Sequence, residues 1–90
     1  MLPRPHPSVV FRTVSEGAVL LHLENEVYFG LNSVGASIWQ LLAPRCDCLD
    51  DLCTRLLAGF PDANPGELRR DVEDLLAQLH ESDLVIAPAS

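Results

Sequence analysis

The sequence contains no lysine, and its six basic residues, all arginine, stand against 13 acidic residues. With the three histidines counted as neutral, the net charge is −7 at pH 7. Proteins that bind nucleic acid gain much of their affinity from Lys and Arg contacts to phosphate, so an acidic chain is repelled by the phosphate backbone. The composition therefore argues against nucleic-acid binding and favours a neutral or basic partner.

The sequence also lacks long apolar runs. No stretch approaches the roughly 20 apolar residues that a membrane-spanning helix needs. Residues 1–8, MLPRPHPS, lack the apolar centre of a secretory signal peptide. Three cysteines cannot all pair within one chain, which is typical of reduced thiols. We therefore expect a cytoplasmic protein with no membrane span.

Patterns for a metal site or a catalytic centre are missing as well. Structural zinc takes four ligands, usually in two pairs, whereas only Cys46, Cys48 and Cys53 cluster here. Neither His22 nor His80 is their neighbour in the sequence. A nucleophilic cysteine needs a base and an orienting group, and no triad, paired acids or glycine-rich phosphate loop is present. We predict buried or loop thiols, with no catalytic residue, no metal and no cofactor.

The length allows one small domain. With 90 residues, 48% of them apolar, the chain is long enough for a modest core. Pro3, Pro5 and Pro7 favour an extended start, because each proline fixes φ and removes a hydrogen-bond donor. The predicted organisation is a flexible arm over residues 1–8, one domain over residues 9–86 and a flexible tail over residues 87–90.

Short apolar segments separated by polar turns predict three antiparallel strands in the first third of the chain. They are Ser8–Val14, Ala18–Leu23 and Val27–Leu31. Pairing the stronger apolar faces directs six side chains toward the helices: Val19, Leu21, Leu23, Val27, Phe29 and Leu31. This arrangement places His22 on the outer face of the sheet.

Helical spacing begins directly after the third strand. Asn32 or Ser33 can cap the first helix, and residues 43–46 end it. In the second helix, Asp47 is the candidate cap and Gly59 marks the end.

The third helix has the clearest start in the chain. Asn64 is its predicted cap, Pro65 occupies the first helical position, and the helix is expected to end near residues 80–82. Three strands followed by three helices predict an α+β domain of the winged helix-turn-helix type, with a three-stranded antiparallel sheet.

Several motifs occur in an order that resembles a known family. They are Tyr28-Phe29-Gly30-Leu31-Asn32, Gly35-Ala36, Ile38-Trp39, Leu41-Leu42, Asp71-Val72, Leu75-Leu76 with Leu79, and Leu84-Val85. Over roughly residues 9–86, their order and spacing are similar to those of the PqqD-like proteins. These proteins are the leader-peptide recognition elements of pathways that modify ribosomally made peptides, and the resemblance implies the same winged fold.

The resemblance also implies a function without catalysis. Such proteins hold the leader segment of a precursor peptide and deliver its core to modifying enzymes. A domain this short, with no fused enzyme, is most similar to the leader-binding partner of a lasso-peptide pathway, which works with a leader peptidase and a macrolactam cyclase. Leaders of that type offer a Tyr, a Pro and an aliphatic residue to the groove.

Three other functions stay open at this point. One is a PqqD-type peptide chaperone for a radical-SAM enzyme, and another is a winged-helix DNA-binding module. The third is a structural or dimerisation module. Catalysis is the least favoured, because so small a domain has little surface left to enclose a substrate.

The third strand supplies a physical reason for peptide binding. In the strand order 1-2-3 it ends the sheet, and its unpaired N–H and C=O groups can pair with an added strand. The resemblance implies that the third helix lies along this edge and forms a groove. The predicted peptide-binding residues are Val27, Tyr28, Phe29, Gly30, Leu31, Arg69, Asp71, Val72, Glu73 and Leu76.

The helical positions have separate roles in this prediction. Val72 and Leu76 form the far wall of the groove, and Arg69 and Glu73 form its polar rim. Asp71 matches a position of the family, but it projects toward the opposite flank of the helix at 100° per residue.

Overall fold

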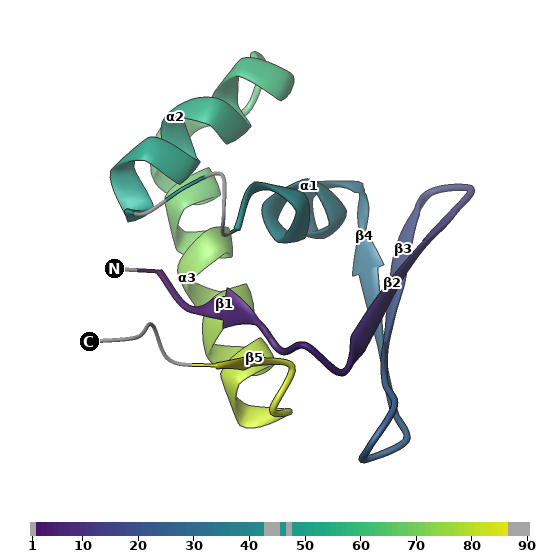
Figure 1. Ribbon diagram of the computed structural model, residues 1–90. Coiled ribbons are helices and arrows are strands. Elements are labelled where there is room, and N and C mark those ends of the chain that lie inside the picture. Colours follow the sequence, from purple (N-terminus) through teal and green to yellow (C-terminus); the bar gives the residue numbers. More distant parts are fainter. Residues whose placement is uncertain (1, 43–45, 47, 87–90) are drawn as a thin grey trace.

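The sheet and the helices follow one another along the chain in the predicted order (Figure 1). The computed structural model describes residues 2–42, 46 and 48–86. The elements are β1 (Arg4–Pro5), β2 (Val9–Val14), β3 (Gly17–His22), β4 (Val27–Asn32), α1 (Ser33–Leu41), α2 (Leu49–Gly59), α3 (Pro65–Glu81) and β5 (Val85–Ile86). The prediction of a three-stranded antiparallel sheet followed by three helices is confirmed.

The sheet has the strand order β2-β3-β4, so β4 lies at an edge. A four-residue turn joins β3 to β4, and its last residue, Glu26, adopts a φ of 56°. A side chain in this left-handed region is strained, and the backbone hydrogen bond from Glu26 N–H to the His22 carbonyl, 2.8 Å long, helps to hold it. This turn sets the register of the two strands.

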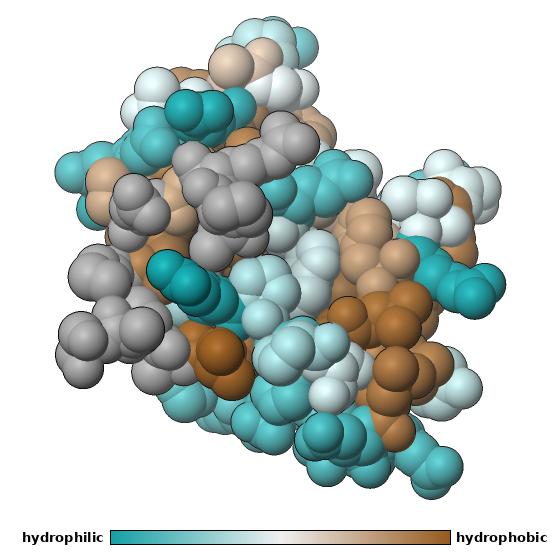
Figure 2. Space-filling model, in the orientation of Figure 1, coloured by the Kyte–Doolittle hydropathy of each residue, from teal (hydrophilic) through white to brown (hydrophobic). Residues whose placement is uncertain are grey.

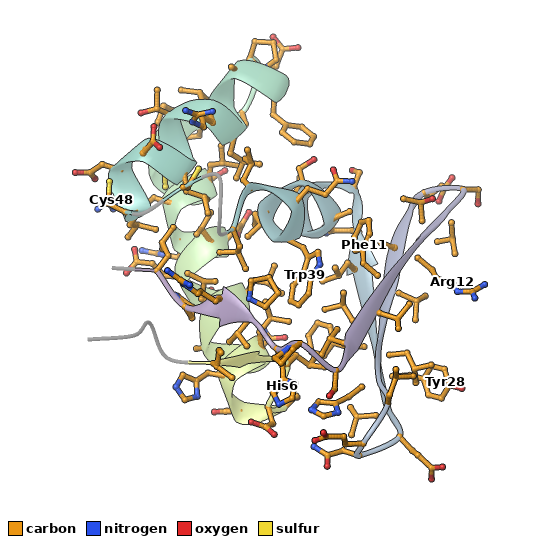
Figure 3. The ribbon with its side chains drawn as sticks, viewed as in Figure 1. His6, Phe11, Arg12, Tyr28, Trp39 and Cys48 are labelled. Carbon is orange, nitrogen blue, oxygen red and sulfur yellow. The ribbon has the colours of Figure 1, made fainter. Side chains whose placement is uncertain are left out.

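The inner face of β3 is the opposite of the predicted one. Ala18, Leu20 and His22 are buried, whereas Leu23 is 59% exposed. His22 is therefore completely enclosed, and the prediction that it lies on the outer face is wrong. Figure 3 shows the two faces: Phe11 and Trp39 lie on the helix side of the sheet, and Arg12 and Tyr28 point away from the helices.

The register explains this difference. Phe29 pairs with Leu20, and Val27 pairs with His22, so these cross-strand neighbours share a face. The inner face predicted for β4 is correct, but it meets the even-numbered residues of β3. Side chains alternate along a strand, so a register one residue away from the expected one moves every side chain of β3 to the other face.

Asparagine caps begin two of the helices as predicted. The side chain of Asn32 accepts a 2.8 Å hydrogen bond from Gly35 N–H at the start of α1. At the start of α3, the side chain of Asn64 accepts bonds from the N–H groups of Gly66 and Glu67. The candidate cap of α2, Asp47, lies outside the described residues. Within the described part of the chain, no helix is both long enough and apolar enough to cross a membrane.

A single apolar cluster joins the inner face of the sheet to the three helices. Its buried members are Leu2, Ala18, Leu20, Leu31, Ile38, Trp39, Leu42, Cys46, Leu52, Leu56, Leu68, Val72, Leu79, Leu84 and Val85. Because α3 contributes Leu68, Val72 and Leu79, its rotation about its own axis is fixed by this core.

The start of the chain differs from the flexible arm expected for residues 1–8. Arg4–Pro5 form β1, which pairs antiparallel with β5, and the two short strands lie side by side in Figure 1. Leu2 is buried in the core, and His6 N–H donates a 3.0 Å hydrogen bond to the Leu84 carbonyl. The predicted tail over residues 87–90 lies outside the described residues.

Candidate functional site

A groove of about 400 Å³ opens beside the edge strand β4. It lies between the end of β4, the first turns of α1 and the middle of α3. Its lining residues are Phe29, Gly30, Leu31, Asn32, Val34, Gly35, Ile38, Asp71, Asp74, Leu75 and Gln78. One side of the groove is thus an unpaired strand edge, and the other is a helix.

The direct passage from β4 into α1 shapes one end of this groove. Asn32 ends the strand and caps the helix at once, so the chain turns without a loop. At Gly35, a Cβ atom would lie 3.2 Å from the Leu31 side chain and 3.3 Å from the Asn32 side-chain oxygen. Glycine at this position therefore allows α1 to start close against the end of the strand.

The α3 wall consists of one helical stripe, Asp71, Asp74, Leu75 and Gln78, spaced at i, i+3, i+4 and i+7. Leu75 is half-buried, and the other three side chains are exposed. The stripe therefore offers one apolar contact flanked by two carboxylates and an amide.

Of the ten predicted site residues, the structure places Phe29, Gly30, Leu31 and Asp71 around the groove. The edge position of β4, on which the strand half of the prediction depended, is observed. Asp71, which the sequence assigned to the opposite flank of the helix, lines the groove.

Two of the predicted helical residues turn toward α2 instead. Arg69 donates a 2.7 Å hydrogen bond to Asp50 of α2, and Glu73 lies 4.0 Å from the Arg69 guanidinium. The hydrogen bond to Asp50 raises the pKa of Arg69. The predicted rim thus belongs to the contact between α2 and α3, because this flank of α3 lies beside α2 and not beside β4.

The other four predicted residues do not line the groove. Val72 is fully buried in the core, and Leu76 is partly buried against it. Tyr28 is 73% exposed and, as Figure 3 shows, points away from the helices; Val27 is half-buried at the far end of β4. Asp74, Leu75 and Gln78, which follow Asp71 at helical spacing, line the groove but were not among the predicted residues.

Figure 2 shows one face of the molecule, on which apolar side chains (brown) gather over the sheet at the right of the view, with polar ones (teal) around them. A cluster of polar side chains lies at the opposite end of the sheet from the groove. Ligand atoms of His6, His22 and Glu24 lie within 4.8 Å of one another, the spacing of a metal site. The rings of His6 and His22 are 4.5 Å apart, and Figure 3 labels His6 beside the start of β2. His6 is half-buried.

Hydrogen bonding argues against a metal in this cluster. The Nδ1 atom of His22 accepts from the backbone N–H groups of Glu24 and Asn25, at 3.2 and 3.3 Å. The Nδ1 atom of His6 accepts from Ser8 N–H at 3.0 Å. A neutral imidazole whose Nδ1 accepts a bond carries its proton on Nε2, which then has no lone pair for a metal. The cluster closes the β3–β4 turn and holds the first residues of the chain.

The three free cysteines differ in exposure: Cys46 is buried, Cys53 is half-buried and Cys48 is exposed. Burial raises the pKa of both the Cys46 and the Cys53 thiol, and nearby Asp51 raises that of Cys46 further. Thiolates are the reactive form, so buried thiols with raised pKa values react slowly.

Iodoacetamide is therefore expected to modify Cys48 first in the folded protein, with Cys46 and Cys53 reacting more slowly. Mass spectrometry of protein alkylated for increasing times near neutral pH measures the order, and the same reaction in denaturant supplies the control. Equal rates at all three thiols in the folded protein would contradict the assignment of Cys46 and Cys53 to buried positions.

The sequence matches the protein-family profile described as Coenzyme PQQ synthesis protein D (PqqD) over residues 17–85. The chain belongs to the PqqD family. The match runs from the start of β3 to the first residue of β5, so it includes every residue of the groove. No curated protein matches the sequence.

Two solved structures share this PqqD fold over nearly the whole chain. One is TbiB1 in complex with the TbiA(beta) leader peptide, with a TM-score of 0.79, 29% sequence identity, and coverage of 97% of this chain and 99% of TbiB1. The other is a lasso peptide synthetase B1 complexed with the leader peptide, with a TM-score of 0.76 and 24% identity, covering 98% of this chain and all of that one (100%).

Proposed function

We propose that this PqqD-family protein binds the leader segment of a ribosomally made precursor peptide, without catalysing a reaction on it. The leader adds as a strand to the edge of β4, beside α3. The observation that carries this proposal is the open β4 edge bordering a groove of about 400 Å³. The fold match to TbiB1, which is 29% identical and was solved with a leader peptide, supports it.

Strand addition suits the two sides of the groove. Alternate N–H and C=O groups of an edge strand point away from its neighbour and can pair with an extended peptide, whatever its sequence. Side chains on the helix side of the added strand then meet Phe29, Leu31 and Leu75. Backbone pairing supplies affinity, and these apolar contacts supply selectivity.

The proposed setting is a lasso-peptide pathway in the cytoplasm, with a leader peptidase and a macrolactam cyclase as partners. The support is the second structural match, a lasso peptide synthetase B1. A peptide chaperone for a radical-SAM enzyme is the alternative that the family description favours, since that description names coenzyme PQQ synthesis.

DNA binding is poorly supported by the charges on the helices. Asp50 and Asp51 lie in the first turn of α2, and Arg55 and Arg69 are engaged with them in ion pairs. Arginines held in this way, on an acidic chain, offer little to a phosphate backbone.

Titration calorimetry with synthetic leaders of precursor genes from the same locus tests the proposal. We expect a dissociation constant between about 1 μM and 1 nM, or about −8 to −12 kcal/mol. A backbone N-methyl scan of the bound leader then tests the mode of binding, because an N-methyl group removes one donor. Strand addition predicts losses at every second position of the paired segment.

The scan leaves the protein unchanged, so a loss of affinity cannot come from unfolding. Losses of affinity that do not recur at every second position would exclude strand addition. The absence of any heat of binding with every leader tested would exclude leader binding altogether. Duplex DNA serves as the comparison ligand and is expected to show no binding at roughly physiological salt. A tight, salt-sensitive DNA complex would instead support the winged-helix alternative.

A further inference from the structure

The groove beside β4 carries an unbalanced charge. Asp71 and Asp74 lie less than one helical turn apart on α3, and both line the groove. In the described part of the chain, neither carboxylate takes part in an ion pair or a side-chain hydrogen bond. Arg70, four residues before Asp74, forms no such pair among the described residues, and Arg69 is held by Asp50 on the α2 side.

An added strand would send every second side chain toward these carboxylates. Side chains alternate along a strand, and those that share the inner face with Phe29 and Leu31 point toward α3. The space that receives them has an apolar part, which includes Phe29, Leu31 and Leu75, and two carboxylates at its margin. An inward side chain with an apolar stem and a polar end therefore matches both parts of this space.

Lysine and arginine have this construction, since a chain of methylene groups carries a cationic head that can stay partly in water. A purely aliphatic residue would fill the apolar part and leave both carboxylates without a partner. A tyrosine hydroxyl could donate to one carboxylate, but it supplies no positive charge.

We propose that the groove selects a leader with a lysine or arginine at one inward-facing position, where its head binds Asp71 and Asp74. This inference rests on the proposed function and deepens it, because it names the side chain that the leader must offer. It predicts that selectivity among leaders depends on charge as well as on apolar fit, and therefore on salt.

Selection from a display library of random peptides tests the proposal even where the natural leader has not been identified. The library is selected in parallel on the natural protein and on a double variant, Asp71→Asn with Asp74→Asn. Both positions are exposed, so the amide is expected to leave the fold intact, and thermal melts check this. Among peptides selected on the natural protein, lysine or arginine should be enriched at one fixed position. Among peptides selected on the double variant, this enrichment should be lost.

An affinity cycle then measures the interaction. An enriched peptide and its Lys→Gln (or Arg→Gln) counterpart are titrated against both proteins. On the natural protein the change is expected to weaken binding about fivefold, the upper end for an exposed ion pair, and on the double variant less than about twofold. Asp62→Asn is the matched control, since it removes one exposed carboxylate outside the groove and should retain the full difference.

The possible outcomes separate this inference from the proposed function. Enriched peptides that bind but carry an aromatic or aliphatic residue at the fixed position would overturn the charge selection and leave leader binding standing. A library that yields no binders to either protein would overturn both. An equal effect of Lys→Gln on the natural protein and on the double variant would overturn the assignment to Asp71 and Asp74 and place the cation elsewhere on the surface.

Discussion

Replacing Gly17 with Ala is expected to lower the free energy of unfolding by about 3 kcal/mol, the upper range for an added methyl group with no space to occupy. Gly17 is the first residue of β3 and pairs with Asn32 at the end of β4. A Cβ atom built on Gly17 would overlap the carbonyl oxygen of Leu31, which is backbone and cannot rotate away. The two strands would have to separate at the point where β4 passes into α1.

Thermal and urea unfolding followed by circular dichroism measure this effect. For a domain of this size, a loss of about 3 kcal/mol corresponds to a fall in melting temperature of more than about 10 °C. Gly30→Ala is the matched control, because a Cβ there meets no atom within 4 Å. The control is expected to change stability by less than about 0.5 kcal/mol. Equal effects of the two substitutions would show that the close approach at Gly17 does not limit the fold.

Replacing Gly30 with Pro is expected to weaken leader binding at least about tenfold, the loss that follows when about 1.4 kcal/mol of backbone pairing is removed. Gly30 lies on the edge strand and lines the groove, and its exposure leaves room for the proline ring. Proline removes the N–H group and fixes φ, so the strand loses a donor and the freedom to align with a partner. Calorimetry with the leader that binds best measures the loss.

Gly30→Ala again supplies the control, since it adds a side chain but keeps the N–H group. The alanine variant is expected to bind the leader nearly as tightly as the natural protein does. Melting curves accompany every titration, so that unfolding of the proline variant is recognised as such. A proline variant that melts normally and binds the leader with undiminished affinity would exclude β4 as the docking edge.

Local signals in the sequence were enough to predict the order of the elements. Alternation over two residues marked the three strands of the sheet, and Asn32 and Asn64 marked where α1 and α3 begin. Each signal depends on residues within one or two turns of the chain, so distant contacts did not have to be inferred. The edge position of β4 could be predicted as well. Each short turn pairs a strand with the next one along the chain, which gives the order β2-β3-β4.

The pairing of the two chain ends had no local signal. Arg4–Pro5 and Val85–Ile86 are two-residue strands that neither alternation nor turn residues reveal. Their pairing depends on the burial of Leu2 and Leu84, which only the assembled core provides. A proline-rich start that looks flexible in isolation is therefore held in place by contacts with residues near the other end of the chain.

By itself, the sequence determined the fold class, the edge strand and the family that its motifs resemble. Only the tertiary structure decided which face of β3 is buried and which flank of α3 lines the groove. Both depend on small shifts. A one-residue change in register reverses which face of a strand is buried, and a rotation of a helix by about 100° brings Asp74 to the side that Glu73 occupied. The apolar residues of β3 lie on both of its faces, and the apolar stripe of α3 fixes its core face but not which of its flanks meets β4. The packing of the assembled elements therefore decides both.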